Sequence, residues 1–231
     1  MDNDNIASKS NRREFLGTLA ASAAIGMTSL ASPVDVTAST GLNQDGTDLE
    51  AWFDKIKGKH KMVFDATQPH GIYPFGWPRG FLLVNEMTGT PEKDCSAVVV
   101  LRHDAIPYAF EDRIWEKYKL GEHFKVNDPA TKAPAIRNPF AKPKLDEYKL
   151  PGLGTVLIGI NELQASGVLF CVCAMAMTVH GSTIATTMKM DPVEISKDWT
   201  SALLPGIQVV PSGVWALGRA QERGCGYCFT G

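Results

Sequence analysis

Short apolar runs rich in β-branched residues recur along the chain and are separated by amphipathic segments. The clearest run, at 97–101, reads Ala-Val-Val-Val-Leu and is apolar at every position, which is typical of a parallel strand covered on both faces. The other runs share this character and are bounded by turn residues. The pattern predicts five strands, at residues 61–65, 97–101, 168–173, 207–210 and 225–229.

Segments with helical spacing of apolar residues lie between these runs. Four glycines, Gly121, Gly167, Gly181 and Gly224, stand where such segments stop, a position that favours glycine because the chain adopts a left-handed conformation there. The helices that we expect cover residues 49–56, 78–87, 109–120, 155–166, 174–180, 199–204 and 212–222.

The alternation of strands and helices predicts an α/β fold. Right-handed crossovers between parallel strands place helices on both faces of a sheet, so we expect a three-layer α/β/α sandwich with a mainly parallel sheet of about five strands. Ligands bind such folds outside the carboxyl ends of the strands. The residues expected at that edge are Asp65, Gln68, Arg102, His103, Cys173, Pro211 and Ser212.

Residues 122–154 interrupt the alternation of strands and helices. This stretch holds five of the 14 prolines in the chain, together with a cluster of lysines. A connection of this length is uncommon inside a domain, and it is usually functional or serves as an arm that binds a partner. We therefore expect a long Pro/Lys-rich loop here.

The beginning of the chain has the composition of an export signal. Arg12 and Arg13 form a twin-arginine pair, and a weakly apolar run with a small-residue exit at Ala31 follows them. The run is shorter than the roughly 20 apolar residues that a spanning helix needs, so we expect no stable membrane insertion after export. The predicted organisation is a twin-arginine signal peptide at 1–31, a linker that can hold a short helix at 32–58, and a folded periplasmic domain at 59–231.

Charge and motif content exclude several classes of function. The formal net charge of −2 gives no strong field for nucleic acid, so no nucleic-acid partner is expected. Nucleotide-binding glycine loops, the GxSxG serine motif and the HExxH zinc motif are absent, so no cofactor and no motif-bound metal are expected. The five cysteines are an odd number, which leaves at least one thiol unpaired within the chain.

Cys173 is the strongest candidate for chemistry. It ends the predicted strand at 168–173 and directly precedes a predicted helix, whose dipole and free amides stabilise a thiolate. The alternative is a buried cysteine that acts as a small apolar side chain. Cys171 lies two residues earlier on the same strand face, about 6.5 Å away along the backbone. A disulfide needs Cβ atoms about 4 Å apart, so we expect Cys171 to be a core residue without a bridge to Cys173.

Cys225 and Cys228 have CxxC spacing but lie in the last predicted strand. Residues three apart on a strand point to opposite faces, whereas a redox dithiol motif opens a helix. No second pair of ligands is present that would complete a zinc site. We therefore interpret both cysteines as structural.

His103 and Arg102 directly follow the strand at 97–101 and are the other candidates for the site. A histidine at the carboxyl end of a strand can act as an acid, a base or a metal ligand near neutral pH. The alternative is a histidine that bonds a neighbouring loop carbonyl. Both interpretations of His103 remain open at this point.

The remaining histidines are weaker candidates. His70 lies in the first loop after a strand and can reach the crevice at the carboxyl edge. His180 stands about 10 Å of helical rise from Cys173, too far to share one metal or one proton with it. His60 and His123 are expected at the surface.

The strand and turn sequences at 96–103, 167–173, 209–217 and 221–227 read SAVVVLRH, GVLFCVC, VVPSGVWAL and QERGCGY. Together they resemble the DsrE/DsrF-like family over about residues 59–229. The resemblance implies a small α/β sandwich that assembles as a trimer or hexamer. In sulfur-relay members a cysteine at this strand end carries a persulfide handed between partner proteins, and the matching position here is Cys173. The relay proteins are cytoplasmic and have no counterpart of the long loop.

Three functions compete at this stage. The leading hypothesis is an exported sulfur carrier or sulfurtransferase component that acts through Cys173, with Arg102 and His103 lining the same crevice and a donor or acceptor protein as partner. The second is a non-enzymatic periplasmic module for a small ligand or a metal, with His103, His70 and Cys173 as ligands. The third is an oligomeric assembly partner whose arm at 122–154 wraps a neighbour.

Overall fold

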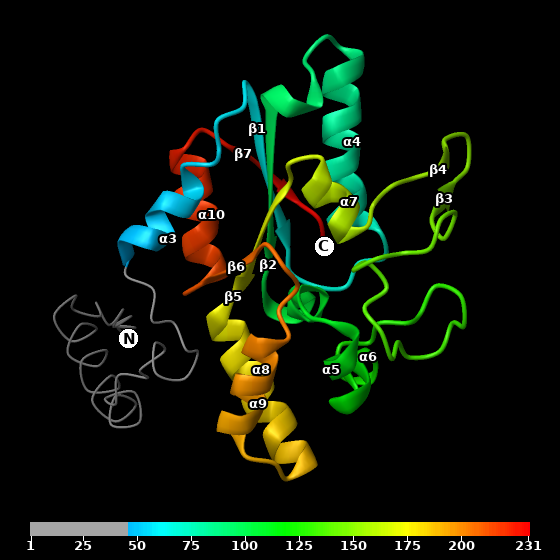
Figure 1. The fold of residues 1–231 in the computed structure, drawn as a ribbon, viewed down its shortest axis with the longest axis vertical. Helices are drawn as coiled ribbons and strands as arrows, with labels where there is room; N and C mark the ends of the chain where they lie inside the picture. The colour runs from blue at the N-terminus through cyan, green and yellow to red at the C-terminus, as the bar shows by residue number, and fades with distance from the viewer. Residues whose placement is uncertain (1–45) are drawn as a thin grey trace, which may run out of the picture. The chain divides into compact units, whose positions relative to one another are not determined.

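A five-stranded sheet forms the centre of the computed structural model, which describes residues 46–231 (Figure 1). Its strands are β1 (His60–Ala66), β2 (Cys95–Leu101), β5 (Leu169–Cys173), β6 (Ile207–Val210) and β7 (Gly226–Phe229). All strand pairs in this sheet are parallel, and the order is β6-β5-β2-β1-β7. Each predicted strand is present with ends at most two residues from those expected, which confirms the α/β class.

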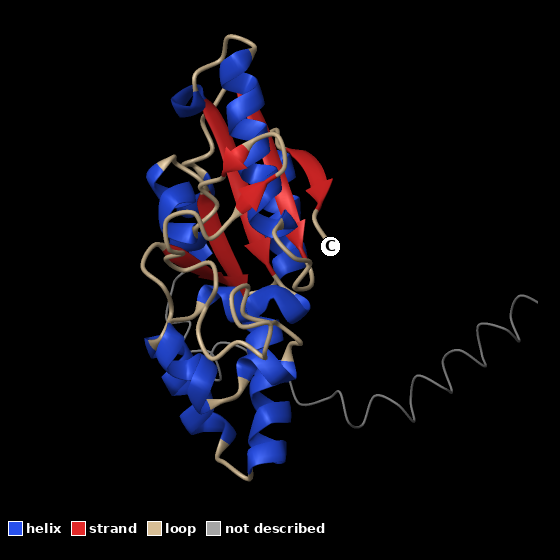
Figure 2. Ribbon diagram, turned by 90° about the vertical axis from the view of Figure 1, so that its right-hand side faces the viewer, coloured by secondary structure: helices blue, strands red, loops and turns tan. Residues whose placement is uncertain are grey.

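Helices cover both faces of the sheet and produce three layers (Figure 1, Figure 2). α4 (Tyr73–Met87) and α7 (Ile160–Ala165) lie on one face, and α3 (Gly46–Phe53) and α10 (Gly213–Glu222) lie on the other. Consecutive strand side chains alternate between the two layers: Phe64 packs with the α4 layer, whereas Val63 packs with α3 and α10. The predicted three-layer α/β/α sandwich is therefore confirmed.

A second group of helices lies beyond the carboxyl ends of the strands (Figure 1, Figure 2). It consists of η2 (His103–Ala109), α5 (Asp112–Lys117), α6 (Leu120–His123), α8 (Ala174–Met188) and α9 (Pro192–Ser201). α8 continues outward from the end of β5, and α9 returns beside it toward β6. These two helices form a hairpin at the carboxyl edge of the sheet and do not cover one of its faces.

Two glycines that were expected to end helices lie inside them. The expected end of a helix at His180 is wrong, because α8 continues through Gly181 to Met188. A Cβ atom at Gly181 would stand 3.7 Å from Cγ2 of Ile195, an ordinary van der Waals contact, so a larger side chain is not excluded there. Gly121 lies within α6, where a Cβ atom would stand 2.2 Å from the carbonyl oxygen of Ala135. Of the two glycines, Gly121 is the one that provides space for a close neighbour.

Other helix boundaries also differ from the expected ones. The single helix expected at 109–120 is divided into η2, α5 and α6, with Lys119 at a left-handed φ of 51° before α6. α4 begins at Tyr73, since Pro74 fits the first turn of a helix, and Pro78 lies inside it. α7 is shorter than the expected helix at 155–166, and α9 begins earlier than the helix expected at 199–204 and overlaps it only at residues 199–201.

The Pro/Lys-rich segment 122–154 packs into the core of its own domain. Phe124, Val126 and Phe140 are buried in the layer that contains α4, and the rings of Phe140 and Tyr148 stack with centroids 4.8 Å apart. The buried amide of Asn138 donates to the carbonyl oxygens of Tyr108 and Phe110 at 2.8 and 2.9 Å. A short antiparallel pair, β3 (Lys149–Leu150) and β4 (Gly154–Thr155), follows. The aromatic side chains of the expected arm are thus buried in this chain itself, whereas Ile136, Leu145 and Leu153 are exposed.

The predicted signal peptide at 1–31 lies outside the described residues. The segment interpreted as a linker, 32–58, contains α3, and its Trp52, Phe53 and Ile56 are buried against α10. A single turn of 3₁₀ helix, η1 (Glu92–Asp94), precedes β2. Among residues 46–231, none of the helices combines the length and apolar character required to cross a bilayer.

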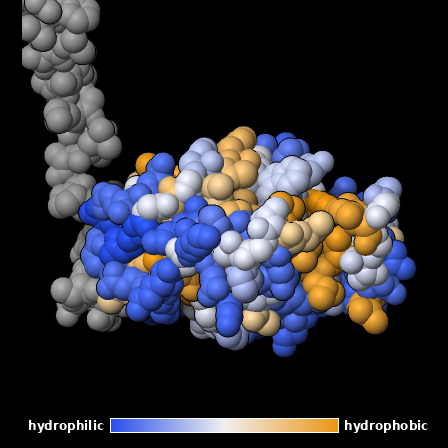
Figure 3. Space-filling model, turned by 90° about the horizontal axis from the view of Figure 1, so that it is seen from above, coloured by the Kyte–Doolittle hydropathy of each residue, from blue (hydrophilic) through white to orange (hydrophobic). Residues whose placement is uncertain are grey.

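Apolar side chains are exposed along one side of α4. Seen from above, apolar surface gathers on the α4 side of the sheet, whereas the α3–α10 side is mostly hydrophilic (Figure 3). The exposed fractions are 48% for Trp77, 58% for Val84 and 85% for Met87. The three residues are seven and three positions apart, so they lie along one stripe of the helix.

Candidate functional site

A buried carboxylate holds Arg102 at the carboxyl edge of the sheet. Asp65 near the end of β1 is 1% exposed, and Arg102 donates to its two oxygens from Nε at 2.7 Å and from Nη2 at 2.9 Å. The Tyr227 hydroxyl of β7 donates to Oδ2 at 2.8 Å. Because β1 pairs with both β2 and β7, these three side chains meet at one edge. The two-pronged contact fixes the guanidinium, and the bond to Asp65 raises the pKa of Arg102 above its ordinary value.

The stem of Arg102 lies on the first turn of α10. A Cβ atom at Gly213 would stand 2.6 Å from Cβ of Arg102, so only glycine fits there. The guanidinium therefore lies close to the amino-terminal end of α10, where backbone amides lack helical partners. The Arg102 side chain remains 26% exposed, which keeps part of the guanidinium accessible to solvent.

Cys173 ends β5 and caps the amino-terminal end of α8. Its Sγ accepts a hydrogen bond from the Ala176 amide at 3.4 Å, and the residue is 6% exposed. Arg102 is near enough that the charge of Cys173 contributes to raising the pKa of Arg102, after the larger effect of Asp65. The amino-terminal end of α8 and the guanidinium of Arg102 thus lie beside the same thiol.

The other cysteines have different surroundings. Cys171 is fully buried, and burial raises the pKa of its thiol far above the ordinary value. Burial also raises the pKa of Cys225 to about 11 and, to a smaller extent, that of Cys228. All five cysteines are free, which confirms that Cys171 and Cys173 form no bridge. Among these thiols, Cys173 is the one that caps a helix.

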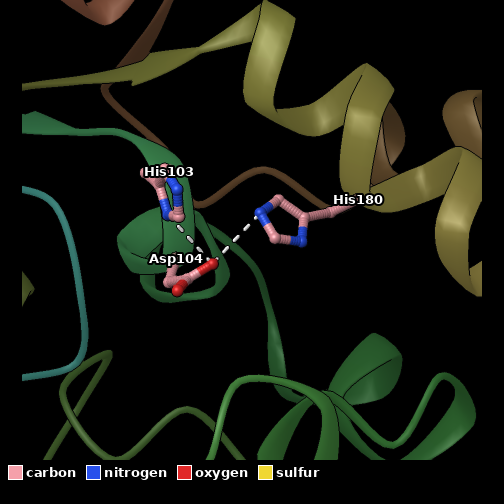
Figure 4. Close-up of side chains that lie close together, drawn as sticks. All are labelled: His103, Asp104 and His180. Atoms are coloured by element: carbon pink, nitrogen blue, oxygen red, sulfur yellow. Dashed lines mark ion pairs between the residues drawn. The ribbon is translucent and has the colours of Figure 1, made fainter.

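His103 takes part in a separate cluster of imidazoles and a carboxylate (Figure 4). Its Nδ1 lies 3.0 Å from Oδ1 of Asp104, and Nε2 of His180 lies 3.3 Å from the same oxygen. Nδ1 of His180 is 3.1 Å from Nε2 of His123. His123 is half-buried in this contact, which corrects its expected place as a surface residue outside any site.

The structure does not assemble the metal ligands expected from the sequence. His70 is hydrogen-bonded to the carbonyl of Thr230 at 3.3 Å, whereas His103 contacts Asp104 and His180. Over residues 46–231, no hydrogen bond or ion pair joins Cys173 to His103. Arg102 is thus the sequence candidate that lies beside Cys173, and His103 belongs to another group.

The direction of α8 explains why the sequence gave no sign of this cluster. The sequence analysis judged His180 only by its distance from Cys173 along one helix, about 10 Å of rise, which is too far for a shared site. Because α8 projects outward from the sheet, its second turn passes η2 instead, and the rings of His103 and His180 come within 6.1 Å. The sequence carried no signal for this contact, because the direction of α8 relative to η2 depends on long-range packing.

No protein-family model, curated protein or solved structure matches this chain. The class that the structure itself defines is a three-layer α/β/α sandwich with an all-parallel central sheet. A fold of this kind supports many unrelated functions, so function must be argued from the site.

Proposed function

We propose that this protein is an exported sulfur carrier of the DsrE/DsrF type, which holds sulfane sulfur as a persulfide on Cys173. The observation that carries the proposal is the position of Sγ, which caps α8 through the Ala176 amide and lies beside Arg102. The resemblance at the strand-end cysteine adds to this argument. The acceptor and the donor are other proteins or small persulfides, and no cofactor takes part.

The proposed reaction is a transfer of one sulfur atom without net oxidation. The Cys173 thiolate attacks the outer sulfur of a donor persulfide R–S–SH, a new S–S bond forms, and the donor S–S bond breaks to release R–S⁻. The thiolate of an acceptor then attacks the outer sulfur of Cys173–S–SH, which regenerates the Cys173 thiolate. The Ala176 amide, the α8 dipole and the Arg102 cation stabilise the anionic sulfur in both steps.

Asp65 and Tyr227 act as positioning residues in this scheme. Asp65 fixes the guanidinium of Arg102 through contacts of 2.7 and 2.9 Å, and Tyr227 holds Asp65 through a hydrogen bond of 2.8 Å. The low exposure of Cys173, 6%, shields the thiol from oxidants in the periplasm. A small donor, or an extended segment of a partner protein, is the kind of reagent that reaches such a sulfur.

Mass spectrometry after treatment with polysulfide tests the proposal. We expect an adduct of one sulfur atom on Cys173, loss of that adduct on reduction, and transfer of the sulfur to an added thiol. Cys173→Ser should abolish the adduct, whereas the matched variant Cys228→Ser, which removes a half-buried thiol of β7, should retain it. A native protein that carries the adduct on Cys228 but not on Cys173 would contradict the proposal.

We also propose that the protein is exported to the periplasm and forms a homo-oligomer, a trimer or a hexamer. The twin arginines support export, and replacement of Arg12 and Arg13 by lysine should leave the protein in the cytoplasmic fraction. The exposed stripe of Trp77, Val84 and Met87 on α4 supports self-association. Light scattering of the native protein should give a mass that is three or six times that of the chain, and Val84→Glu should lower this mass. A monomeric native protein would contradict the oligomer.

A further inference from the structure

A group of side chains outside the Cys173 site has the composition of a metal centre. His103 and Asp104 begin η2 and His180 lies on α8, so two separate elements supply the three residues (Figure 4). One ligand atom from each residue lies within 4.8 Å of the other two. Within residues 46–231, this is the one such group of three or more His, Cys, Asp and Glu side chains.

We propose that His103, Asp104 and His180 bind a divalent transition-metal ion, a function that goes beyond sulfur transfer at Cys173. Two imidazole nitrogens and a carboxylate oxygen are ligands that suit Zn²⁺, Cu²⁺ and Ni²⁺. In a tetrahedral zinc site, bonds of about 2.0 to 2.2 Å place neighbouring ligand atoms about 3.4 Å apart. The distances from Asp104 Oδ1 to the two imidazole nitrogens are 3.0 and 3.3 Å, so small side-chain adjustments suffice.

The charge of the cluster also favours a cation. In the part of the chain that the structure describes, Asp104 forms ion pairs with the two histidines and with no lysine or arginine. A divalent cation would supply the counter-charge that no lysine or arginine of the described residues gives this carboxylate.

His123 completes the arrangement as an outer-sphere partner. Its Nε2 lies 3.1 Å from Nδ1 of His180, the nitrogen on the far side of the ring from Asp104. When Nε2 of His180 binds a metal, Nδ1 of the same ring carries the proton and donates a hydrogen bond to Nε2 of His123. Such a bond fixes the tautomer and the orientation of a metal-bound histidine. Phe124 packs against the same ring with centroids 4.7 Å apart and restricts it further.

The site opens to solvent on the side of His103. The His103 side chain is 67% exposed and that of Asp104 is 41% exposed, whereas His180 is 17% exposed. Three protein ligands with one open side leave a coordination position for water or a small anion, as in zinc sites that bind exogenous ligands. The inferred chemistry is therefore binding of a divalent metal with an exchangeable fourth ligand.

Calorimetric titration of the full chain with Zn²⁺ tests this inference, with a purification tag that contains no histidine. We expect one Zn²⁺ per chain, and an affinity at least about 100-fold weaker in Asp104→Asn and His180→Gln. His103→Asn should weaken binding to a similar extent, and Asn tolerates the left-handed φ of 50° at this position. His123→Ala should weaken binding by about 10-fold through the lost outer-sphere bond.

Two controls separate this site from other histidines and from the thiols. His60→Asn removes a histidine that contacts Thr90 at the start of β1, the end of the strand opposite to the site. This variant should leave the Zn²⁺ affinity unchanged. Cys173→Ser should also retain binding, and the Co²⁺-loaded protein should show no sulfur-to-cobalt charge-transfer band. Absence of saturable binding, or equal binding by native protein and His180→Gln with native circular dichroism, overturns the inference. Loss of binding in Cys173→Ser overturns it as well, whereas a failed persulfide experiment alone leaves it intact.

Discussion

Arg102 and His103 are neighbours in the sequence but belong to two different sites. Arg102 is extended, with φ −136° and ψ 170°, and its side chain reaches Asp65 and α10. His103 has a φ of 50°, begins η2, and reaches toward α8. The change of backbone conformation between Arg102 and His103, at the end of β2, therefore directs two adjacent side chains into separate sites.

The two sites also differ in how their carboxylates are satisfied. Asp65 is 1% exposed and receives hydrogen bonds from a guanidinium and a phenol, so its charge is balanced inside the protein. Asp104 is 41% exposed at its side chain and contacts only histidines among the described residues. The first arrangement fixes a guanidinium beside a thiol, whereas the second, among the described residues, includes no lysine or arginine. Burial thus distinguishes Asp65, the carboxylate that positions Arg102, from Asp104, the carboxylate that we propose as a metal ligand.

Removal of each carboxylate should give the largest difference between the sites. Asp65→Ala leaves the Arg102 guanidinium and the Tyr227 hydroxyl without their partner, and we expect the free energy of unfolding to fall by about 3 kcal/mol. Asp104→Ala removes a half-exposed group and should change it by less than about 0.5 kcal/mol when metal is chelated. Urea unfolding measures both values, and equal losses would contradict the assigned difference in burial.

A glycine pair on α10 offers a finer comparison. Gly213→Ala introduces a Cβ atom 2.6 Å from Cβ of Arg102, and we expect a loss of about 2 kcal/mol of stability together with slower persulfide formation on Cys173. Gly218→Ala, on the same helix, meets no atom within 4 Å and should stabilise the protein by about 0.5 kcal/mol. The Zn²⁺ affinity should stay unchanged in both variants. A Gly213→Ala protein with native stability and native sulfur transfer would show that Arg102 has no fixed place.

Glycines also show how far the sequence predicts the fold. Gly167 and Gly224 both have a φ of 86° and end helices, as their positions indicated. Gly121 and Gly181 looked the same in the sequence, but they lie inside helices, and at Gly121 the backbone of Ala135 approaches too closely for a side chain. The sequence alone does not distinguish a glycine needed for its φ from one needed for its size. Strands were easier to predict because each is a short, mainly apolar run bounded by turn residues, and β2 and β5 are apolar on both faces.

The two candidate sites also differ in how far the sequence predicts them. Arg102 and Cys173 were found because the carboxyl ends of parallel strands meet at one edge, a rule that needs only the strand positions. The contact between His103 and His180 depends on the direction in which α8 leaves β5, and local sequence does not determine that direction. Long-range packing of the hairpin against η2 and α5 decides it.

Asp198 of α9 anchors that hairpin to the rest of the domain. Its carboxylate accepts hydrogen bonds from Lys117 at 2.7 Å, from Tyr118 at 2.8 Å and from Arg113. Burial opposes ionisation of this group, but the hydrogen bonds from Lys117, Arg113 and Tyr118 outweigh it and lower the pKa of Asp198 to about 2. Since the ordinary value is 3.8, the ionised carboxylate stabilises the folded state above about pH 4, and this contribution is lost as the pH falls toward 2.

Among the changes expected to destabilise the protein clearly, which are Asp65→Ala, Gly213→Ala and Asp198→Asn, the last should have the smallest effect. Much of the network is exposed to solvent, so we expect a loss of only about 1 kcal/mol at pH 7, measured by urea unfolding. The difference between native protein and variant should shrink as the pH is lowered from 4 to 2, because the native carboxylate becomes protonated there. Zn²⁺ affinity should fall slightly, since a looser hairpin holds His180 less firmly against Asp104. A constant difference across that pH range would show that the ionised carboxylate is not what attaches the hairpin.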